Sequence, residues 1–94
     1  MQPDRVLRVS DQVIFKPVGE EMVLLDFQSG MYYGLDPVGV RIWQLIVESR
    51  PLGEIVATLL EEYDVPREQL EADIDALVRE LEQRGLVSSP RAPL

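Results

Sequence analysis

Residues 24–37 constrain the fold of this chain more than any other part of the sequence. They read as an apolar strand, a short loop, a second strand and a helix start. Gly30 in the loop can adopt the left-handed conformation that short hairpin loops require. The second strand, residues 31–35, contains no Pro, Lys or Glu, the residues that usually protect an exposed sheet edge. We therefore expect an edge strand that is either covered within the protein or offered to another chain.

An antiparallel meander of three strands is predicted before the first helix. Residues 13–16 are β-branched and aromatic, which favours a strand, and Pro17 is expected to end it. Residues 22–27 are apolar on both faces at their centre, which is typical of a middle strand. Strands 13–16 and 31–35 then form the two edges. Lys16 and Pro17 protect the first edge, whereas the second has no such protection.

Three helices are predicted after the sheet. Asp36 is a suitable N-cap, and Pro37 fits the first helical position, where its missing N–H costs nothing. A second helix is expected after Pro51, and Gly85 is expected to end the third in a left-handed cap. The sequence therefore predicts one α+β domain, a three-stranded antiparallel sheet followed by three helices. Its core covers about residues 10–87, with a loosely held N-terminal arm and a frayed C-terminal tail.

Composition excludes several classes of function. The chain has no His and no Cys, so the commonest general bases, nucleophiles and soft metal ligands are missing. We predict a protein that is not an enzyme and that holds no metal and no cofactor. Seventeen acidic residues against nine basic ones give a net charge of −8, which opposes binding to nucleic acid. No apolar run approaches the roughly 20 residues that span a membrane, and no signal peptide is evident, so we expect a cytoplasmic protein.

The third helix is expected to form a groove with strand 31–35. A helical wheel predicts a stripe of residues that face the core. The stripe consists of Leu70, Ile74, Leu77 and Leu81. Val78 widens this stripe on one flank, and an acidic rim follows on the same flank. The rim consists of Glu71, Asp75 and Glu82. An extended peptide could add to strand 31–35 by main-chain hydrogen bonds and place alternate side chains in this groove.

Two patterns along the chain are typical of a known family. The first comprises residues 23–26, 30–39 and 42–43. The second comprises residues 54–56, 60, 63–65, 73–74, 77–78, 81 and 85–86. In these residues, and over about residues 10–87 as a whole, the chain resembles the PqqD-like family.

The resemblance implies a winged-helix-like fold and a function. Family members recognise ribosomally made, post-translationally modified peptides without catalytic activity of their own. They bind the leader of a precursor peptide as an extra strand against the third helix. The strand around Tyr33 is more similar to stand-alone proteins of lasso-peptide clusters, which work with a separate leader peptidase and a cyclase. By this resemblance the pairing edge comprises Met31, Tyr32, Tyr33, Gly34 and Leu35, and the groove wall Ile74, Asp75 and Val78.

Other functions stay open from the sequence. One is a PqqD-type peptide chaperone of quinone-cofactor synthesis. Another is a regulatory homodimer that pairs strand 31–35 with its own copy, so that the protein is a monomer or a weak strand-paired dimer. A winged-helix transcription factor is disfavoured, because the third helix is acidic and would meet a negative DNA groove.

Overall fold

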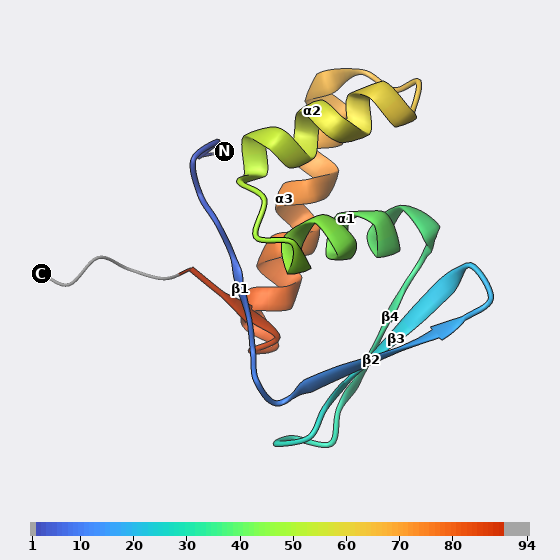
Figure 1. Ribbon diagram of the computed structural model, residues 1–94, viewed down its shortest axis with the longest axis vertical. Coiled ribbons are helices and arrows are strands. Elements are labelled where there is room, and N and C mark those ends of the chain that lie inside the picture. Colours follow the sequence, from blue (N-terminus) through green and yellow to red (C-terminus); the bar gives the residue numbers. More distant parts are fainter. Residues whose placement is uncertain (1, 90–94) are drawn as a thin grey trace, which may run out of the picture.

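The computed structural model describes residues 2–89 as a sheet covered on one face by helices (Figure 1). The sheet has the order β2-β3-β4 and is antiparallel throughout. Its strands are β2 (Val13–Val18), β3 (Glu21–Asp26) and β4 (Tyr32–Leu35). The helices are α1 (Pro37–Val47), α2 (Leu52–Glu62) and α3 (Arg67–Gln83). The predicted α+β, winged-helix-like fold is confirmed.

The meander follows the predicted order, and each strand differs from its predicted range by one or two residues at its ends. β3 is the middle strand, and Gly30 has a φ of 72°, as its loop requires. β2 continues through Pro17 to Val18, because Pro is tolerated at an outer strand where its missing N–H would face away from the sheet. β4 begins at Tyr32, and Met31 belongs to the loop.

The core lies between the inner face of the sheet and the three helices. Leu24 and Leu35 from the sheet and Trp43 from α1 belong to this buried cluster. Phe15 of β2 packs edge-on against Trp43, with ring centroids 6.3 Å apart. The side chain of Trp43 is fully buried, which makes it a core residue. Its indole N–H has no hydrogen-bond partner among the described residues.

Two helix ends confirm the predicted caps. The N–H of Gly39 donates to Asp36 Oδ1 at 2.7 Å, so Asp36 is the N-cap of α1. At the end of α3, Gly85 has a φ of 72° and Leu86 N–H donates to the Leu81 carbonyl at 2.9 Å. This bond closes a Schellman-type cap and turns the chain into β5 (Val87–Ser88).

The N-terminal arm, expected to be loosely held, lies against the helices in the structure. Its strand β1 (Arg8–Val9) pairs antiparallel with β5, and Leu7 is buried. The carbonyls of Arg5 and Pro3 accept hydrogen bonds of 2.9 Å from the first N–H groups of α2. The arm therefore caps a helix whose own N-cap, Pro51, offers no side-chain acceptor. Ser88 of the predicted frayed tail lies in β5, and residues 90–94 of that tail lie outside the described residues.

None of the described helices combines the length and the apolarity that crossing a membrane requires. The described residues also contain no cluster of three or more acidic side chains placed to hold a metal ion.

Candidate functional site

The outer edge of β4 presents unpaired backbone groups. The carbonyl of Met31 accepts a hydrogen bond of 3.0 Å from an N–H of β3. Positions that bond to a neighbouring strand alternate along an antiparallel ladder, so Tyr33 and Leu35 also bond to β3. Tyr32 and Gly34 consequently point their N–H and C=O groups away from the sheet. Within residues 2–89 no strand pairs with this edge. It offers two donors and two acceptors to an added strand.

The opposite edge of the sheet, on β2, is much less available. The Gln12 carbonyl accepts a 2.8 Å hydrogen bond from the Phe27 N–H. This bond determines which positions of β2 bond to β3 and which point away from the sheet. Of the outward-facing positions, Val13 donates its N–H to the Ser10 carbonyl at 3.4 Å, and Pro17 has no N–H. β2 therefore cannot form a continuous ladder with another chain. β4 is the edge of this sheet that can accept a further strand.

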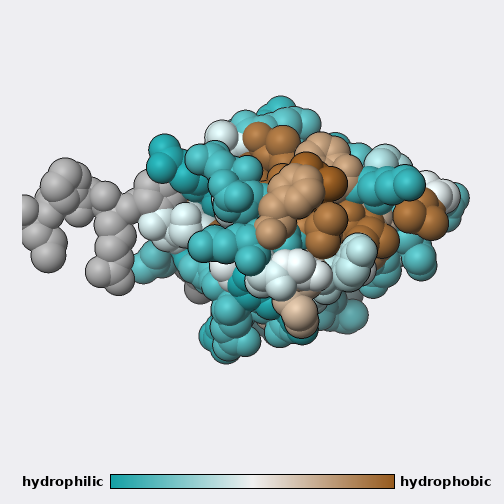
Figure 2. All heavy atoms as spheres, turned by 90° about the horizontal axis from the view of Figure 1, so that it is seen from below, coloured by the Kyte–Doolittle hydropathy of each residue, from teal (hydrophilic) through white to brown (hydrophobic). Residues whose placement is uncertain are grey.

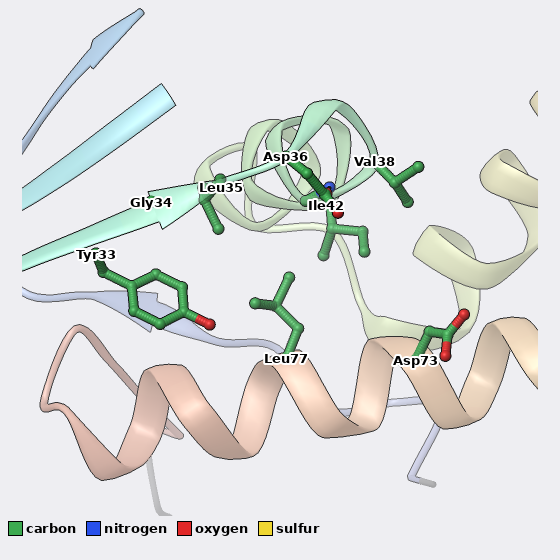
Figure 3. A pocket seen from close by; sticks show the side chains of 9 residues that line it. Tyr33, Gly34, Leu35, Asp36, Val38, Ile42, Asp73 and Leu77 are labelled. Carbon is green, nitrogen blue, oxygen red and sulfur yellow. The ribbon is translucent and has the colours of Figure 1, made fainter. Parts of the chain in front are cut away.

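A groove of about 440 Å³ runs between β4, the start of α1 and one flank of α3. We call it the β4–α3 groove (Figure 3). It is lined by Tyr33, Gly34, Leu35, Asp36, Val38, Gly39, Ile42, Asp73 and Leu77. Figure 3 shows Tyr33 of β4 and Leu77 of α3 directed into the space between the two elements. The middle of the groove is therefore apolar, and the carboxylates of Asp36 and Asp73 make it acidic at the α1 side.

The C-terminal turns of α3 hold Tyr33 at the other end of the groove. The guanidinium of Arg84 lies over the Tyr33 ring, 4.9 Å from its centroid, in cation–π geometry. Arg84 Nε also donates to Glu80 Oε1 at 3.0 Å. Burial, and then the negative charge of Glu80, raise the pKa of the Tyr33 hydroxyl above its ordinary value, against the opposing charge of Arg84. The phenol is therefore a neutral group at physiological pH, able to donate or accept a hydrogen bond.

A comparison with protein-family models identifies the chain. The model described as Coenzyme PQQ synthesis protein D (PqqD) matches residues 21–87, which include the sheet from β3 onward and all three helices. The chain belongs to the PqqD family.

Two solved structures are similar to this PqqD-family chain over most of its length. One, described as TbiB1 in complex with the TbiA(β) leader peptide, is 38% identical with a TM-score of 0.83. The match covers 90% of this chain and 99% of that one. The other, described as lasso peptide synthetase B1 complexed with the leader peptide, is 30% identical with a TM-score of 0.81. This second match covers 87% of this chain and 96% of the lasso peptide synthetase B1 chain. No curated protein matches the sequence.

The helix face that borders β4 in the PqqD-family chain differs from the predicted one. Val78 and Ile74, expected to form the groove wall, have 0% exposure and lie in the core. The prediction that Val78 widens the apolar surface towards the groove is therefore wrong. Leu77, which we had placed in the core stripe, is half-buried and forms the groove wall together with Asp73. The helical wheel predicted the periodicity of α3 correctly, but it did not predict which elements pack against each flank of the helix.

The predicted acidic rim lies on the other flank of α3. Glu82 forms an ion pair with Arg5 of the N-terminal arm. Asp75 pairs with Arg79 and Glu71 with Arg67, each at 3.4 Å along the helix. At 100° per residue these three acids point roughly opposite to Asp73 and Leu77. They do not line the β4–α3 groove.

Of the predicted site, the structure brings together the β4 residues and a different part of α3. Tyr33, Gly34 and Leu35 line the groove, and Tyr32 presents its backbone at the same edge. Met31 lies just before the strand and is exposed. No sequence pattern indicated that Val38 and Ile42 contribute to the groove, because their place beside it depends on how α1 packs against β4.

Proposed function

We propose that this protein is a non-catalytic recognition protein that binds the leader of a ribosomally made precursor peptide. The leader adds to β4 as a fourth strand and places alternate side chains in the β4–α3 groove. The protein then delivers the bound peptide to a separate leader peptidase and a cyclase, as in lasso-peptide biosynthesis. The observation that carries this proposal is the open edge at Tyr32 and Gly34, which adjoins an apolar groove. The two similar structures, both complexes with a leader peptide, support it.

The groove specifies the chemistry of the peptide. Leu35, Ile42 and Leu77 favour an apolar or aromatic side chain at its centre. Asp36 and Asp73 favour a basic or hydrogen-bond-donating residue at the α1 side, and the net charge of −8 disfavours a strongly acidic peptide. The leader that fits is therefore an extended segment with alternating apolar residues and few carboxylates.

The magnitudes indicate how much of the site the leader must use. Four ladder hydrogen bonds at about 1 kcal/mol each and two buried apolar side chains at about 1.5–3 kcal/mol each give roughly 7–10 kcal/mol. Ordering a flexible peptide and joining two molecules offset several kcal/mol of that gain. Binding near 1 μM corresponds to about −8 kcal/mol, so it requires the edge, the groove and further side-chain contacts of the leader together.

Calorimetric titration of the precursor's synthetic leader into the protein tests the proposal. We expect one-to-one binding that Leu77→Glu weakens strongly, since the substitution places a charge in the apolar centre of the groove. Ala76→Glu is the matched control, because Ala76 is exposed on the same helix and does not line the groove. The absence of leader binding by the folded wild-type protein would refute the proposal.

Self-pairing of β4 is the competing use of the same edge. Sedimentation across a concentration series separates the two. A dimer that persists when saturating leader is added would show that the edge serves a second copy of the chain, whereas the leader proposal requires a monomeric protein with one peptide bound.

A further inference from the structure

The hydroxyl of Tyr33 is a polar group without a partner in an otherwise apolar part of the β4–α3 groove. Figure 3 shows the ring lying in the space between β4 and α3, with its hydroxyl directed towards Leu77. No hydrogen bond within residues 2–89 engages this hydroxyl. It still contacts water in the free protein, because among the described residues the indole N–H of Trp43 alone is both fully buried and unpartnered. A ligand that fills the groove therefore displaces water from the Tyr33 hydroxyl.

The last turns of α3 fix the position of this hydroxyl. The Arg84 guanidinium lies over the Tyr33 ring, 4.9 Å from its centroid. Arg84 is held in turn by Glu80, whose Oε1 accepts hydrogen bonds from Nη2 at 2.9 Å and from Nε at 3.0 Å. The ring is thus held in one place before a peptide binds, and Arg84 and Glu80 are its positioning residues.

The register of an added strand brings one peptide side chain beside the Tyr33 ring. Tyr32 and Gly34 are the positions of β4 that bond to an added strand, so Tyr33 and Leu35 are non-hydrogen-bonded positions towards it. Residues opposite each other at such positions place their side chains on the same face, with Cβ atoms about 4.5–5.5 Å apart. One leader residue therefore lies beside Tyr33, and the residue two positions away lies beside Leu35, both on the groove side of the sheet.

The charges around Tyr33 favour a neutral polar side chain beside it. Glu80 and Arg84 already pair with each other, so neither offers a free counter-charge to an ionised residue of the peptide. Burial and the negative charge of Glu80 raise the pKa of Tyr33, so the phenol is protonated and can donate as well as accept. An amide or a hydroxyl of the peptide is therefore the group that replaces the displaced water.

From these observations we propose that the Tyr33 hydroxyl determines the specificity of the groove, by hydrogen-bonding an amide or hydroxyl side chain of the leader residue opposite Tyr33. The next groove-facing residue, opposite Leu35, is apolar, so the accepted leader carries a neutral polar and an apolar side chain two positions apart. The inference rests on the proposed function and specifies which peptides its site selects. A leader with an apolar residue opposite Tyr33 binds poorly, because the hydroxyl then loses water without gaining a partner.

A double-mutant cycle between the protein and the synthetic leader tests this hydrogen bond. Tyr33→Phe removes the hydroxyl and keeps the ring under Arg84. In the leader, each amide or hydroxyl side chain is replaced, one at a time, by the apolar residue nearest to it in size. Calorimetry gives the affinity of wild type and of Tyr33→Phe for every leader, and denaturant unfolding shows whether the variant is folded.

Tyr32→Phe is the matched control, because it removes the hydroxyl of the neighbouring tyrosine outside the groove. The Tyr32 side chain is 68% exposed and lies with Val23 and Leu25 on the face of the sheet that points away from the helices. Figure 2 views the molecule from that side and shows hydrophobic side chains gathered there. Both variants keep the main-chain groups of β4, so a difference between them comes from the place of the hydroxyl.

We expect Tyr33→Phe to bind the unaltered leader at least about fivefold more weakly than wild type, and Tyr32→Phe to stay within about twofold. At one leader position the apolar replacement should cost wild type at least about tenfold in affinity and cost Tyr33→Phe under about twofold. Equal affinity of wild type and Tyr33→Phe for the unaltered leader, or losses that multiply at every leader position, would overturn the inference while leader binding stands. Failure of wild type to bind the leader would instead remove the proposed function, and this inference with it.

Discussion

Replacing Gly34 with proline tests whether the β4 edge accepts a strand. The N–H of Gly34 points to the open edge and takes no part in the bonds between β4 and β3. Proline removes this donor and keeps the sheet bonds, and it is tolerated on an edge strand with its ring towards solvent. Tyr33→Pro, by contrast, would remove an N–H that bonds to β3 and would damage the sheet.

The expected loss follows from one unmade hydrogen bond. A carbonyl of the bound peptide would be left without its partner in the interface, which costs about 1–3 kcal/mol. At 1.4 kcal/mol for each factor of ten, leader affinity falls roughly 5- to 150-fold. Contact between the proline ring and the added strand acts in the same direction.

Gly34→Ala is the matched control for this substitution. A Cβ at position 34 meets no described atom within 4 Å, and alanine keeps the N–H. Calorimetric titration with the leader gives the two affinities, and denaturant unfolding shows whether each variant is folded. If Gly34→Pro is folded and binds the leader as tightly as Gly34→Ala, the peptide does not pair with β4 through this position and the reasoning is refuted.

Three further predictions concern the helices. Val78→Ala is expected to lower the free energy of unfolding by about 2 kcal/mol, because a fully buried side chain loses two methyl groups, and to leave the leader affinity of the folded protein unchanged; weaker peptide binding at full folding would contradict the burial of Val78. Leu77→Ala is expected to weaken leader affinity several-fold, as measured by calorimetry. It should lower the free energy of unfolding less than Val78→Ala does, since Leu77 is only half-buried. Glu62→Gln is expected to cost under about 1 kcal/mol at pH 7, because Glu62 accepts hydrogen bonds from Arg41 on the protein surface. The hydrogen bond from Arg41 lowers the pKa of Glu62 below its ordinary value of 4.5, so its contribution is present above that pH and lost as the pH falls through the folded-state pKa; urea unfolding at pH 7 and pH 3 checks this, and an equal difference between the two proteins at both pH values would contradict it.

The local patterns of the chain predicted most of its elements. The loop at Gly30, the N-cap at Asp36 and the turn at Gly85 each depend on a residue and its immediate neighbours. The open edge of β4 could also be predicted, because the protection of an edge is a matter of which residues occupy it. These features need no knowledge of how distant segments pack.

The groove wall could not be predicted from α3 alone. A helical wheel places Leu77 and Val78 100° apart but does not say which neighbour covers which flank. The N-terminal arm decides this, because Arg5 reaches Glu82 and β1 pairs with β5 beside the Val78 flank. The arm carries no strong strand pattern, and its two-residue pairing depends on a partner almost eighty positions away. Once the arm takes that flank, Asp73 and Leu77 are the residues left to face β4.

Amide hydrogen exchange at Tyr32 and Gly34, measured by NMR with and without the leader, decides whether the leader adds to β4 as a strand. In the free protein these two N–H groups face the open edge and should exchange rapidly, whereas those of Tyr33 and Leu35 bond to β3 and should be protected. We predict that the leader slows exchange at Tyr32 and Gly34 and leaves the other two positions protected as before. Bound leader with unchanged, rapid exchange at Tyr32 and Gly34 would contradict strand addition to β4.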